Sequence, residues 1–263
     1  MKIIVCIKQV PETGNVKIDP QTHTLIRSGV PSIINPLDTY AIEEALRWKE
    51  KLGASTLVLS MGPPQAEEAL REAVSMGIDQ ALLLTDRRFA GADTYATAYT
   101  LSLAIRKLAP YDLIFCGKQA IDGDTAQVGP ALAEHLGIPH IAYVKKIEDI
   151  DLQKATVRAH RLMEDGYEIL DSRLPALLTV VKEINEPRFP SLKGKMRAKK
   201  LEIPIWGADD LGAEVANFGL SGSPTQVKEI FAPPARGKGE ILTGEAPLIA
   251  QTLIERLKAQ KII

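Results

Sequence analysis

Short apolar runs alternate with amphipathic segments through the first half of the chain. Four of these runs have the length of buried strands and are bounded by Gly, Pro or polar residues; they span residues 3–10, 56–60, 81–85 and 112–116. The longer segments between them repeat apolar positions at helical spacing. Such alternation predicts an α/β fold, in which helices cover both faces of a doubly wound, mostly parallel sheet.

Helix start and stop signals sharpen this prediction. Asn35 is suited to cap a helix, Pro36 to occupy its first position, and Asp38 to place negative charge near the positive end of the helix dipole. Gly53 is expected to end this helix. Three more helices are predicted: one opened by Pro63-Pro64 and ended by Gly77, one from Asp93 to about Leu108, and one opened by Asp124 or Thr125 and ending near Gly137.

The pattern changes after Pro139 to apolar runs without long helices. These strand-like runs lie at residues 141–147, 155–163, 167–170 and 176–181, and Glu164-Asp165-Gly166 between two of them favours a hairpin. From residue 185 a basic stretch is followed by a Pro- and Gly-rich tract and by a final amphipathic helix at about 246–259. A tract of that composition builds little core of its own, so we expect it to lie against a partner. The predicted division is an α/β domain (1–184), a basic loop (185–200) and a C-terminal arm (201–263).

Composition agrees with an ordinary globular protein, since 45% of the 263 residues are hydrophobic and 25% are charged. The formal net charge of -1 gives no overall electrostatic reason to bind nucleic acid or an anionic membrane. Both cysteines, Cys6 and Cys116, lie inside apolar runs, so no disulfide framework is predicted and a reducing, cytoplasmic compartment is expected. We find no signal peptide and no apolar run near the roughly 20 residues of a membrane span.

Candidate chemistry is expected where parallel strands end, because ligands bind beyond their carboxyl ends and helix N-termini hold phosphate. Four segments should meet there, at residues 5–10, 35–38, 60–63 and 117–128. The last joins a strand to a helix, and the N–H groups of Ala126, Gln127 and Val128 should point outward, as a pyrophosphate site requires. The alternative is an ordinary loop in which Asp124 or Thr125 merely caps the helix.

Other motif searches leave no self-contained catalytic site. The sequence has neither GxxxxGK[ST] nor GxGxxG, and its four histidines lack metal-ligand spacing. Cys6 and Cys116 are interpreted as packed thiols rather than nucleophiles. We therefore predict no catalytic residue and no metal site, and expect any chemistry to belong to a bound cofactor.

The stretch from residue 187 to residue 200 holds six basic residues and no acidic one. A single Phe and the near-zero total charge argue against nucleic-acid binding. Two interpretations stay open: a plain solvated loop, or a docking segment in which apolar contacts and cations attract an acidic partner. In the docking interpretation Leu192 and Met196 supply the apolar contact and Lys193, Lys195 and Arg197 supply charge.

Five ordered blocks of the sequence match one known family. They read VCIKQVP, NPLDTYAIEEALRWKE, SMGPPQAEEALREAVSMGID, GKQAIDGDTAQVGPALAEHLGIP and NEPRFPSLKGKMRAKK. In these blocks the chain resembles the small (beta) subunit of electron transfer flavoproteins. The resemblance implies a Rossmann-like, adenine-nucleotide-binding fold and an obligate large (alpha) subunit that carries exchangeable FAD. It also implies a role in moving electrons between dehydrogenases and other carriers.

Carried over by position, the resemblance places the nucleotide site on the same strand-end segments. It also implies that the basic segment is a recognition loop, whose exposed leucine, here Leu192, anchors a partner dehydrogenase. The implied nucleotide-binding residues are Cys6, Asn35, Pro36, Leu37, Asp38, Met61, Gly117, Lys118, Gln119, Ala120, Ile121, Asp122, Gly123, Asp124, Thr125, Ala126, Gln127 and Val128.

The family has two groups, which differ in the nucleotide of the beta subunit. Respiratory-type members hold a structural AMP there, and side chains crowd the space beyond its phosphate. The glycine-opened loop around Gly123 resembles instead the electron-bifurcating group, because a missing side chain leaves room for a diphosphate and flavin. In that group NAD(H) is the electron donor, and the beta-subunit FAD accepts hydride from NADH. One electron then goes to ferredoxin, and the other passes through the alpha FAD to an acyl-CoA dehydrogenase-like oxidoreductase.

The alternatives are a non-bifurcating beta subunit with structural AMP, and a stand-alone ATP-using enzyme of the same architecture. The missing Gly-rich ATP loops disfavour the second.

Overall fold

A computed structural model describes residues 1–12, 17–18, 25–26, 31–228, 239 and 241–263. The chain forms two compact units, Met1–Glu229 and Ile230–Ile263. The larger unit contains all the sheets, and the smaller one contains the last helix, α7 (Ala246–Ala259).

The larger unit is built on a nine-stranded sheet with the strand order β11-β10-β9-β12-β8-β1-β6-β7-β13. Neighbours from β9 to β13 run parallel, whereas β10 is antiparallel to both β9 and β11. The predicted α/β class with a mostly parallel sheet is therefore confirmed. The strands are β1 (Lys2–Ile7), β6 (Ser55–Met61), β7 (Gln80–Leu84), β8 (Leu113–Gly117), β9 (His140–Asp151), β10 (Thr156–Met163), β11 (Gly166–Arg173), β12 (Ala176–Val180) and β13 (Ile205–Trp206). Short antiparallel pairs form between β2 (Gln9–Pro11) and β5 (Ser32–Ile34), and between β3 (Lys17–Ile18) and β4 (Leu25–Ile26).

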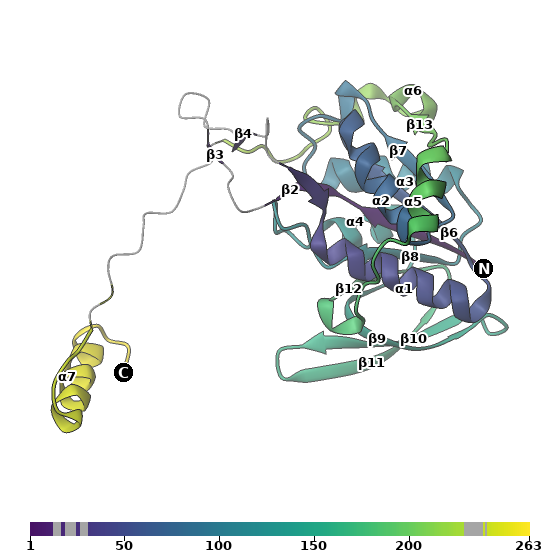
Figure 1. The fold of residues 1–263 in the computed structure, drawn as a ribbon. Coiled ribbons are helices and arrows are strands. Elements are labelled where there is room, and N and C mark those ends of the chain that lie inside the picture. The colour runs from purple at the N-terminus through teal and green to yellow at the C-terminus, as the bar shows by residue number, and fades with distance from the viewer. Residues whose placement is uncertain (13–16, 19–24, 27–30, 229–238, 240) are drawn as a thin grey trace. The chain divides into compact units, whose positions relative to one another are not determined.

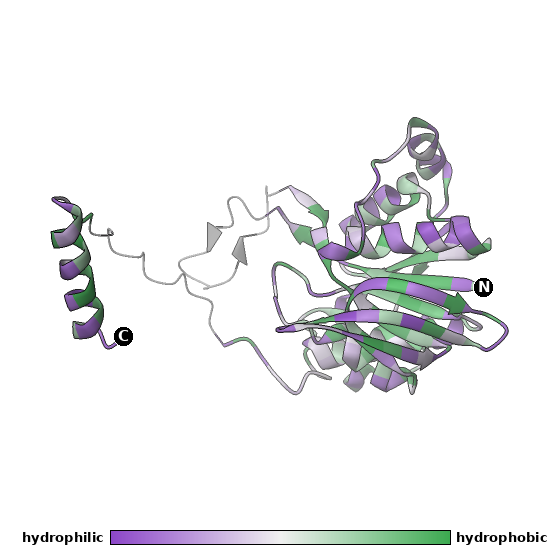
Figure 2. Cartoon of the chain, turned by 90° about the horizontal axis from the view of Figure 1, so that it is seen from below, coloured by the Kyte–Doolittle hydropathy of each residue, from purple (hydrophilic) through white to green (hydrophobic). Residues whose placement is uncertain are grey.

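Helices cover both faces of this sheet (Figure 1). Side chains of β1 alternate between the two faces: Ile3 and Val5 join the core under α1 and α2, while Ile4 and Cys6 join the core under α3 and α4. Hydrophobic residues accordingly concentrate along the central strands (Figure 2). The helices of this unit are α1 (Pro36–Leu52), α2 (Glu67–Met76), α3 (Thr94–Lys107), α4 (Val128–Leu136), α5 (Leu192–Lys200) and α6 (Ala208–Leu211). Short 3-10 turns lie at Pro64–Ala66, Arg87–Phe89, Lys182–Ile184 and Val215–Asn217.

Local signals explain most helix ends. Pro36 occupies the first turn of α1, and Gly53 ends the helix in the left-handed conformation at φ 67°. The Asp93 carboxylate caps α3 by accepting the N–H of Ala96 at 3.0 Å. The prediction that Asp124 or Thr125 opens the fourth helix is wrong, because α4 begins at Val128. Asp124 and Ala126 have left-handed φ values of 53° and 55°, which a right-handed helix cannot contain.

The region after Pro139 forms the antiparallel end of the sheet. Met163 pairs with Gly166 across the turn from β10 to β11, so the predicted hairpin is confirmed. The chain then returns to the parallel part as β12, between β9 and β8.

The C-terminal third differs from the sequence prediction in two places. Residues 185–200 are not simply a loop, since α5 begins after a cap in which Ser191 Oγ accepts the N–H of Gly194 at 2.9 Å. Part of the predicted arm packs into the larger unit, because Ile203, Leu211 and Phe218 are buried and β13 adds to the sheet beside β7. The Phe218 ring lies 5.2 Å from the ring of Phe89. The functional division at residues 184 and 200 stays a prediction.

In the smaller unit, α7 confirms the predicted final helix. Hydrophobic residues line one side of it (Figure 2). Within the described parts of the chain, no helix combines the length and the apolarity that crossing a membrane requires.

Candidate functional site

The strand order creates a switch point between β1 and β8. The chain adds β6 and β7 on one side of β1 and then places β8 on the other side. In a sheet of this type the ligand crevice lies beyond the carboxyl ends of the two strands at the switch point. Cys6 and Cys116 are direct partners on these two strands, so both sit at the border of the expected crevice.

A buried carboxyl group holds the two strand ends and the start of α1 together at this switch point. Asp38, near the start of α1, accepts the N–H of Lys8 at 2.7 Å and also the N–H of Gly117. A Cβ atom at Gly117 would lie 2.3 Å from Asp38 Oδ1, so this close approach requires glycine. Burial raises the pKa of Asp38 to about 7, although its hydrogen bonds favour the charged form. The end of β1, the end of β8 and the start of α1 are thus held in one arrangement.

Asn35 holds the loop that follows β8. Its side-chain Nδ2 donates to Gln119 O at 2.9 Å, and its Oδ1 accepts the N–H of Ile121 at 3.1 Å. Its backbone N–H donates to Lys8 O at 2.8 Å. The expectation that this side chain caps α1 is wrong, because both of its polar atoms bind the loop instead. Asn35 is fully buried, so the loop is joined to a rigid part of the fold.

Residues 118–127 form an extended connection rather than the start of a helix. Lys118 N–H donates to Val180 O at 2.9 Å, Asp124 N–H donates to Ala120 O at 2.8 Å, and the Gln119 side chain donates to the Asp124 carboxylate. Ala126 is left-handed and Gln127 right-handed, at φ -100°. Alternation of this kind turns successive N–H groups toward one side, which is the geometry of an anion-binding nest. The predicted donors Ala126, Gln127 and Val128 therefore lie in a suitable backbone arrangement.

One further feature fits a nucleotide with phosphate groups. A Cβ atom built at Gly123 would meet no heavy atom of the described structure within 4 Å, and its φ is not left-handed. Backbone donors beside an open glycine are what a phosphate-bearing ligand uses.

The remaining nucleotide residues of the prediction are placed less tightly. Met61 ends β6, one strand farther from the switch point than β1, and pairs with Leu84 of β7. Cys6 and Cys116 are free, buried thiols. The hydrogen bond with Cys6 and burial together raise the pKa of Cys116 well above its usual value, so this thiol stays protonated. This agrees with the interpretation of both cysteines as packing residues.

One charged residue of the site lies in the predicted segment 5–10 but was not among the predicted nucleotide-binding residues. Lys8 Nζ lies 2.7 Å and 2.8 Å from the two carboxylate oxygens of Asp122, in the loop after β8. Lys8 belongs to the VCIKQVP block, so its position in that block was an available signal.

The basic segment presents apolar side chains to solvent. Leu192 is 78% exposed and Met196 57% exposed, both on α5, and Phe189 just before the helix is 94% exposed. Lys193 and Lys195 are also exposed. Phe189 was not among the predicted docking residues, and it adds a third exposed apolar side chain to this segment. The exposed apolar side chains therefore favour the docking interpretation over a plain solvated loop.

Other residues of this segment attach it to the body of the protein. Arg197 donates to Val74 O at 2.9 Å and to Ile78 O, around the C-terminal end of α2, so it stabilises the fold rather than standing free for a partner. Arg188 pairs with Glu43 at 2.8 Å. A Cβ atom at Gly194 would lie 2.0 Å from Ser75 O, so glycine lets α5 pack directly on α2.

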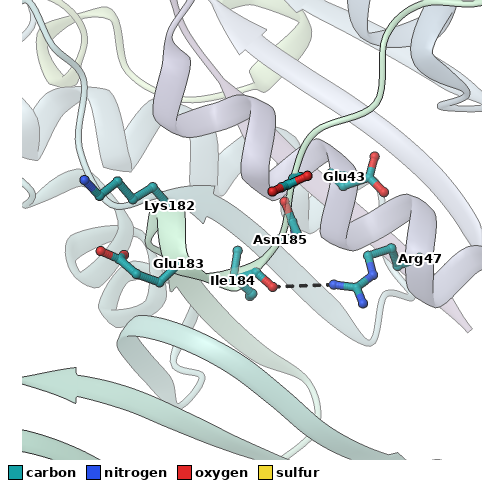
Figure 3. Close-up of a pocket in the computed structure, with 7 residues that line it drawn as sticks. Glu43, Arg47, Lys182, Glu183, Ile184 and Asn185 are labelled. Carbon is teal, nitrogen blue, oxygen red and sulfur yellow. Dashed lines mark hydrogen bonds between the residues drawn. The ribbon is translucent and has the colours of Figure 1, made fainter.

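A cavity of about 520 Å³ lies between α1 and the segment after β12 (Figure 3), and none of the predicted nucleotide-binding residues lines it. Arg47 crosses it and donates to Ile184 O at 3.4 Å. Its lining includes three glutamates against two cations, so it does not favour an anionic nucleotide. The lining residues are Glu43, Arg47, Lys182, Glu183, Ile184, Asn185 and Glu186.

Comparison with known proteins identifies the family of this chain. Residues 22–211 match the model of the electron transfer flavoprotein domain. The electron transfer flavoprotein subunit beta of Thermoanaerobacterium thermosaccharolyticum is 56% identical over 264 residues and all of both chains. The caffeyl-CoA reductase-Etf complex subunit CarD of Acetobacterium woodii is 51% identical over 265 residues, again over all of both chains. Protein FixA of Bradyrhizobium diazoefficiens is 47% identical over 98% of this chain and 91% of its own. The chain therefore belongs to the electron transfer flavoprotein beta-subunit family.

Proposed function

We propose that this chain binds FAD, rather than a structural AMP, at the switch point between β1 and β8. As a member of its family it works with a large subunit. When bound here, FAD would supply the redox chemistry: hydride uptake from NADH and delivery of single electrons to ferredoxin and, through the large-subunit FAD, to an acyl-CoA dehydrogenase-like partner. Such a complex would operate in the cytoplasm.

The observation that carries this proposal is the open space at Gly123. Some glycines of the fold are explained by packing, because a side chain there would clash with a neighbour. Examples are Gly117 against Asp38 and Gly194 against Ser75. Gly123 has no left-handed φ, and no described neighbour lies within 4 Å of the position that a methyl group would occupy there. The protein's own packing therefore does not explain the glycine, whereas a ligand that continues past the first phosphate would. The relative CarD, named as part of a caffeyl-CoA reductase complex, supports a CoA-thioester oxidoreductase as partner.

The residues of this chain would bind and orient the nucleotide. The backbone N–H groups of the nest at Ala126 and Gln127 would donate to phosphate oxygens, and Asn35 and Asp38 would keep the loop and the strand ends in position. No side chain of this chain is assigned a proton or electron step.

We further propose that the exposed apolar patch of Phe189, Leu192 and Met196 is the docking site for the dehydrogenase partner. Lys193 and Lys195 lie on the same segment and would attract an acidic surface. Since Arg197 is occupied by carbonyl groups of the fold, we assign it a structural role within this segment.

The first test is a count of nucleotides. The chain is purified with its large subunit, the protein is denatured, and released FAD and AMP are quantified by chromatography. Two FAD and no AMP per heterodimer are expected. One FAD and one AMP would overturn the proposal and leave this chain a structural partner of the large-subunit flavin.

Substitutions at Gly123 test the steric argument separately. Gly123→Asp should remove FAD from the beta site while leaving the fold intact, since the added side chain meets no described atom of the protein itself. Gly123→Asn, which has the same size without the charge, distinguishes crowding from repulsion. Gly239→Asp, at another glycine where an added Cβ atom would meet no described atom within 4 Å, is the control. Full FAD content in both Gly123 variants would contradict the role assigned to this glycine.

A further inference from the structure

The backbone of Lys8 is held in place at the switch point between β1 and β8. Its backbone N–H donates to the buried Asp38 carboxylate at 2.7 Å, and its carbonyl accepts the N–H of the buried Asn35 at 2.8 Å. The backbone N–H and the carbonyl group of Lys8 are therefore both hydrogen-bonded to residues at the start of α1. The direction of the Lys8 side chain is thus set by the same residues that fix the loop after β8.

The ammonium group of Lys8 pairs with an acidic residue of that loop. Its Nζ lies 2.7 Å and 2.8 Å from the two oxygens of Asp122, which is 114 positions away in the sequence. The Lys8 side chain is 48% exposed and that of Asp122 only 15%. Asp122 is therefore the more desolvated member, and it depends on Lys8 for neutralisation.

The charge of the loop itself is unfavourable for an anionic ligand. Residues 117–128 contain one lysine, Lys118, and two aspartates, Asp122 and Asp124, which leaves a formal net charge of -1. Lys118 Nζ lies 5.3 Å above the ring of Tyr143, and Asp124 accepts a hydrogen bond from the Gln119 amide. Lys8 contacts Asp122, and its positive charge brings the formal net charge of the loop together with Lys8 to zero.

We propose that Lys8 is a further binding residue for the phosphate chain of the nucleotide, and that Asp122 holds it in position while opposing the bound anion. This inference rests on the proposed nucleotide site and deepens it, since it names the charge balance on which the affinity depends. Without Lys8, an unpaired and largely buried carboxylate lies in the loop that binds phosphate. Without Asp122, the Lys8 ammonium is released toward the ligand.

The test is a two-residue cycle on the heterodimer stripped of nucleotide. Lys8→Gln, Asp122→Asn and the double variant are titrated by calorimetry with AMP and with ADP, which shares the diphosphate of FAD. Because all forms contain the same large subunit, differences in Kd report on this chain. Lys154, 79% exposed, lies 2.9 Å from Asp151, 26% exposed, where β9 ends, and this second Lys–Asp pair gives matched controls as Lys154→Gln and Asp151→Asn.

Loss of one favourable charge near the ligand is expected to weaken ADP binding about tenfold in Lys8→Gln, and to weaken AMP binding less. Asp122→Asn should tighten ADP binding, and the double variant should return to within about threefold of the unaltered protein. The control variants should match the unaltered protein. Unfolding temperatures without nucleotide separate this effect from loss of fold.

Two results would overturn the inference: an affinity of Lys8→Gln within about twofold of the unaltered protein, or a double variant as weak as Lys8→Gln. These outcomes differ from failure of the proposed FAD function. A heterodimer purified with AMP in this chain would end the FAD proposal, yet the cycle measured with AMP would still report on Lys8 and Asp122.

Discussion

At the scale of single residues, the candidate site depends on a few polar side chains that join distant segments. Asp38 binds the ends of two strands, and Asn35 binds the loop after β8 with both of its polar atoms. Each is at least nine-tenths buried, so each fixes backbone that would otherwise be solvated and variable. The geometry of the site is thus a property of the scaffold.

The buried Asp38 carboxyl makes stability depend on pH in a defined direction. Its pKa is raised from 3.8 to about 7, so the folded state binds the proton more tightly than the unfolded state. The resulting contribution is complete below the unfolded pKa and is lost as pH rises through about 7. Relative to Asp38→Asn, the unaltered protein should lose stability between about pH 4 and pH 7, by at most about 1.4 kcal/mol per pH unit.

This prediction is checked by thermal unfolding of the purified heterodimer across that range. Asp93→Asn is the control, because the pKa of Asp93 is lowered although burial opposes the shift; backbone and Thr225 hydrogen bonds stabilise its charge. Its contribution is present above the unfolded pKa and is lost only as pH falls below it, so its effect should be level from about pH 5 to pH 7. A pH-independent difference between Asp38→Asn and the unaltered protein would refute the raised pKa.

At the scale of elements, the loop after β8 and the helix α5 each depart from their local signals. The loop contains two non-glycine residues in the left-handed region, which costs on the order of 1–2 kcal/mol for each and is maintained by contacts from Asn35 and Val180. Helix α5 is held on α2 through Gly194 and Arg197, and its opposite side carries exposed apolar residues. A helix fixed in this way presents its side chains in one orientation, as docking requires.

Truncation of the exposed leucine on α5 tests that role. Leu192→Ala should weaken binding of the dehydrogenase partner by about 1–4 kcal/mol, since central apolar anchors contribute most of an interface's energy. FAD content should be unchanged, because the helix is separate from the loop residues of the site. Partner affinity is measured by calorimetry or by electron-transfer rate at varied partner concentration.

The matched control is Leu152→Ala, at a leucine that is 45% exposed in the turn after β9. If Leu192→Ala and Leu152→Ala bound the partner equally well, the docking site would lie elsewhere.

At the scale of the whole molecule, the apolar side chains of α7 stay at least partly exposed within the described part of the smaller unit. No residue of α7 is buried within the part of the chain that the structure describes, and Leu248, Leu253 and Ile254 are each more than two-fifths exposed. An amphipathic helix such as α7 is stabilised mainly by packing of its apolar face against another surface. The large subunit that the family implies is the partner on which we expect α7 to pack.

Leu253→Glu should therefore weaken the heterodimer, because it places a charge in the apolar face of α7. Gln251→Glu, on the polar side of the same helix, introduces the same charge as a control. Association is measured by sedimentation of the two subunits over a dilution series. Unchanged association of the Leu253→Glu chain would show that α7 does not contribute to the subunit interface.

Features that depend on neighbouring residues could be predicted from the amino-acid sequence alone. Pro36 and Gly53 bound α1, Asp93 caps α3, and Glu164-Asp165-Gly166 turns a hairpin, since each signal acts within about one helical turn or one β-turn. The order of strands and helices then indicated a mostly parallel sheet, and the five sequence blocks indicated the family.

Which polar groups meet across the fold became known only from the three-dimensional arrangement. Asn35 serves the loop instead of capping α1, Arg197 binds α2 instead of standing free, and Lys8 faces Asp122. Phe218, in a Pro- and Gly-rich tract, is buried against Phe89. Each of these contacts joins residues far apart in the chain, so it depends on how the sheet brings strands together. A local pattern carries no information about such long-range pairing, and this is why the segments of the site were predictable while the bonds that shape it were not.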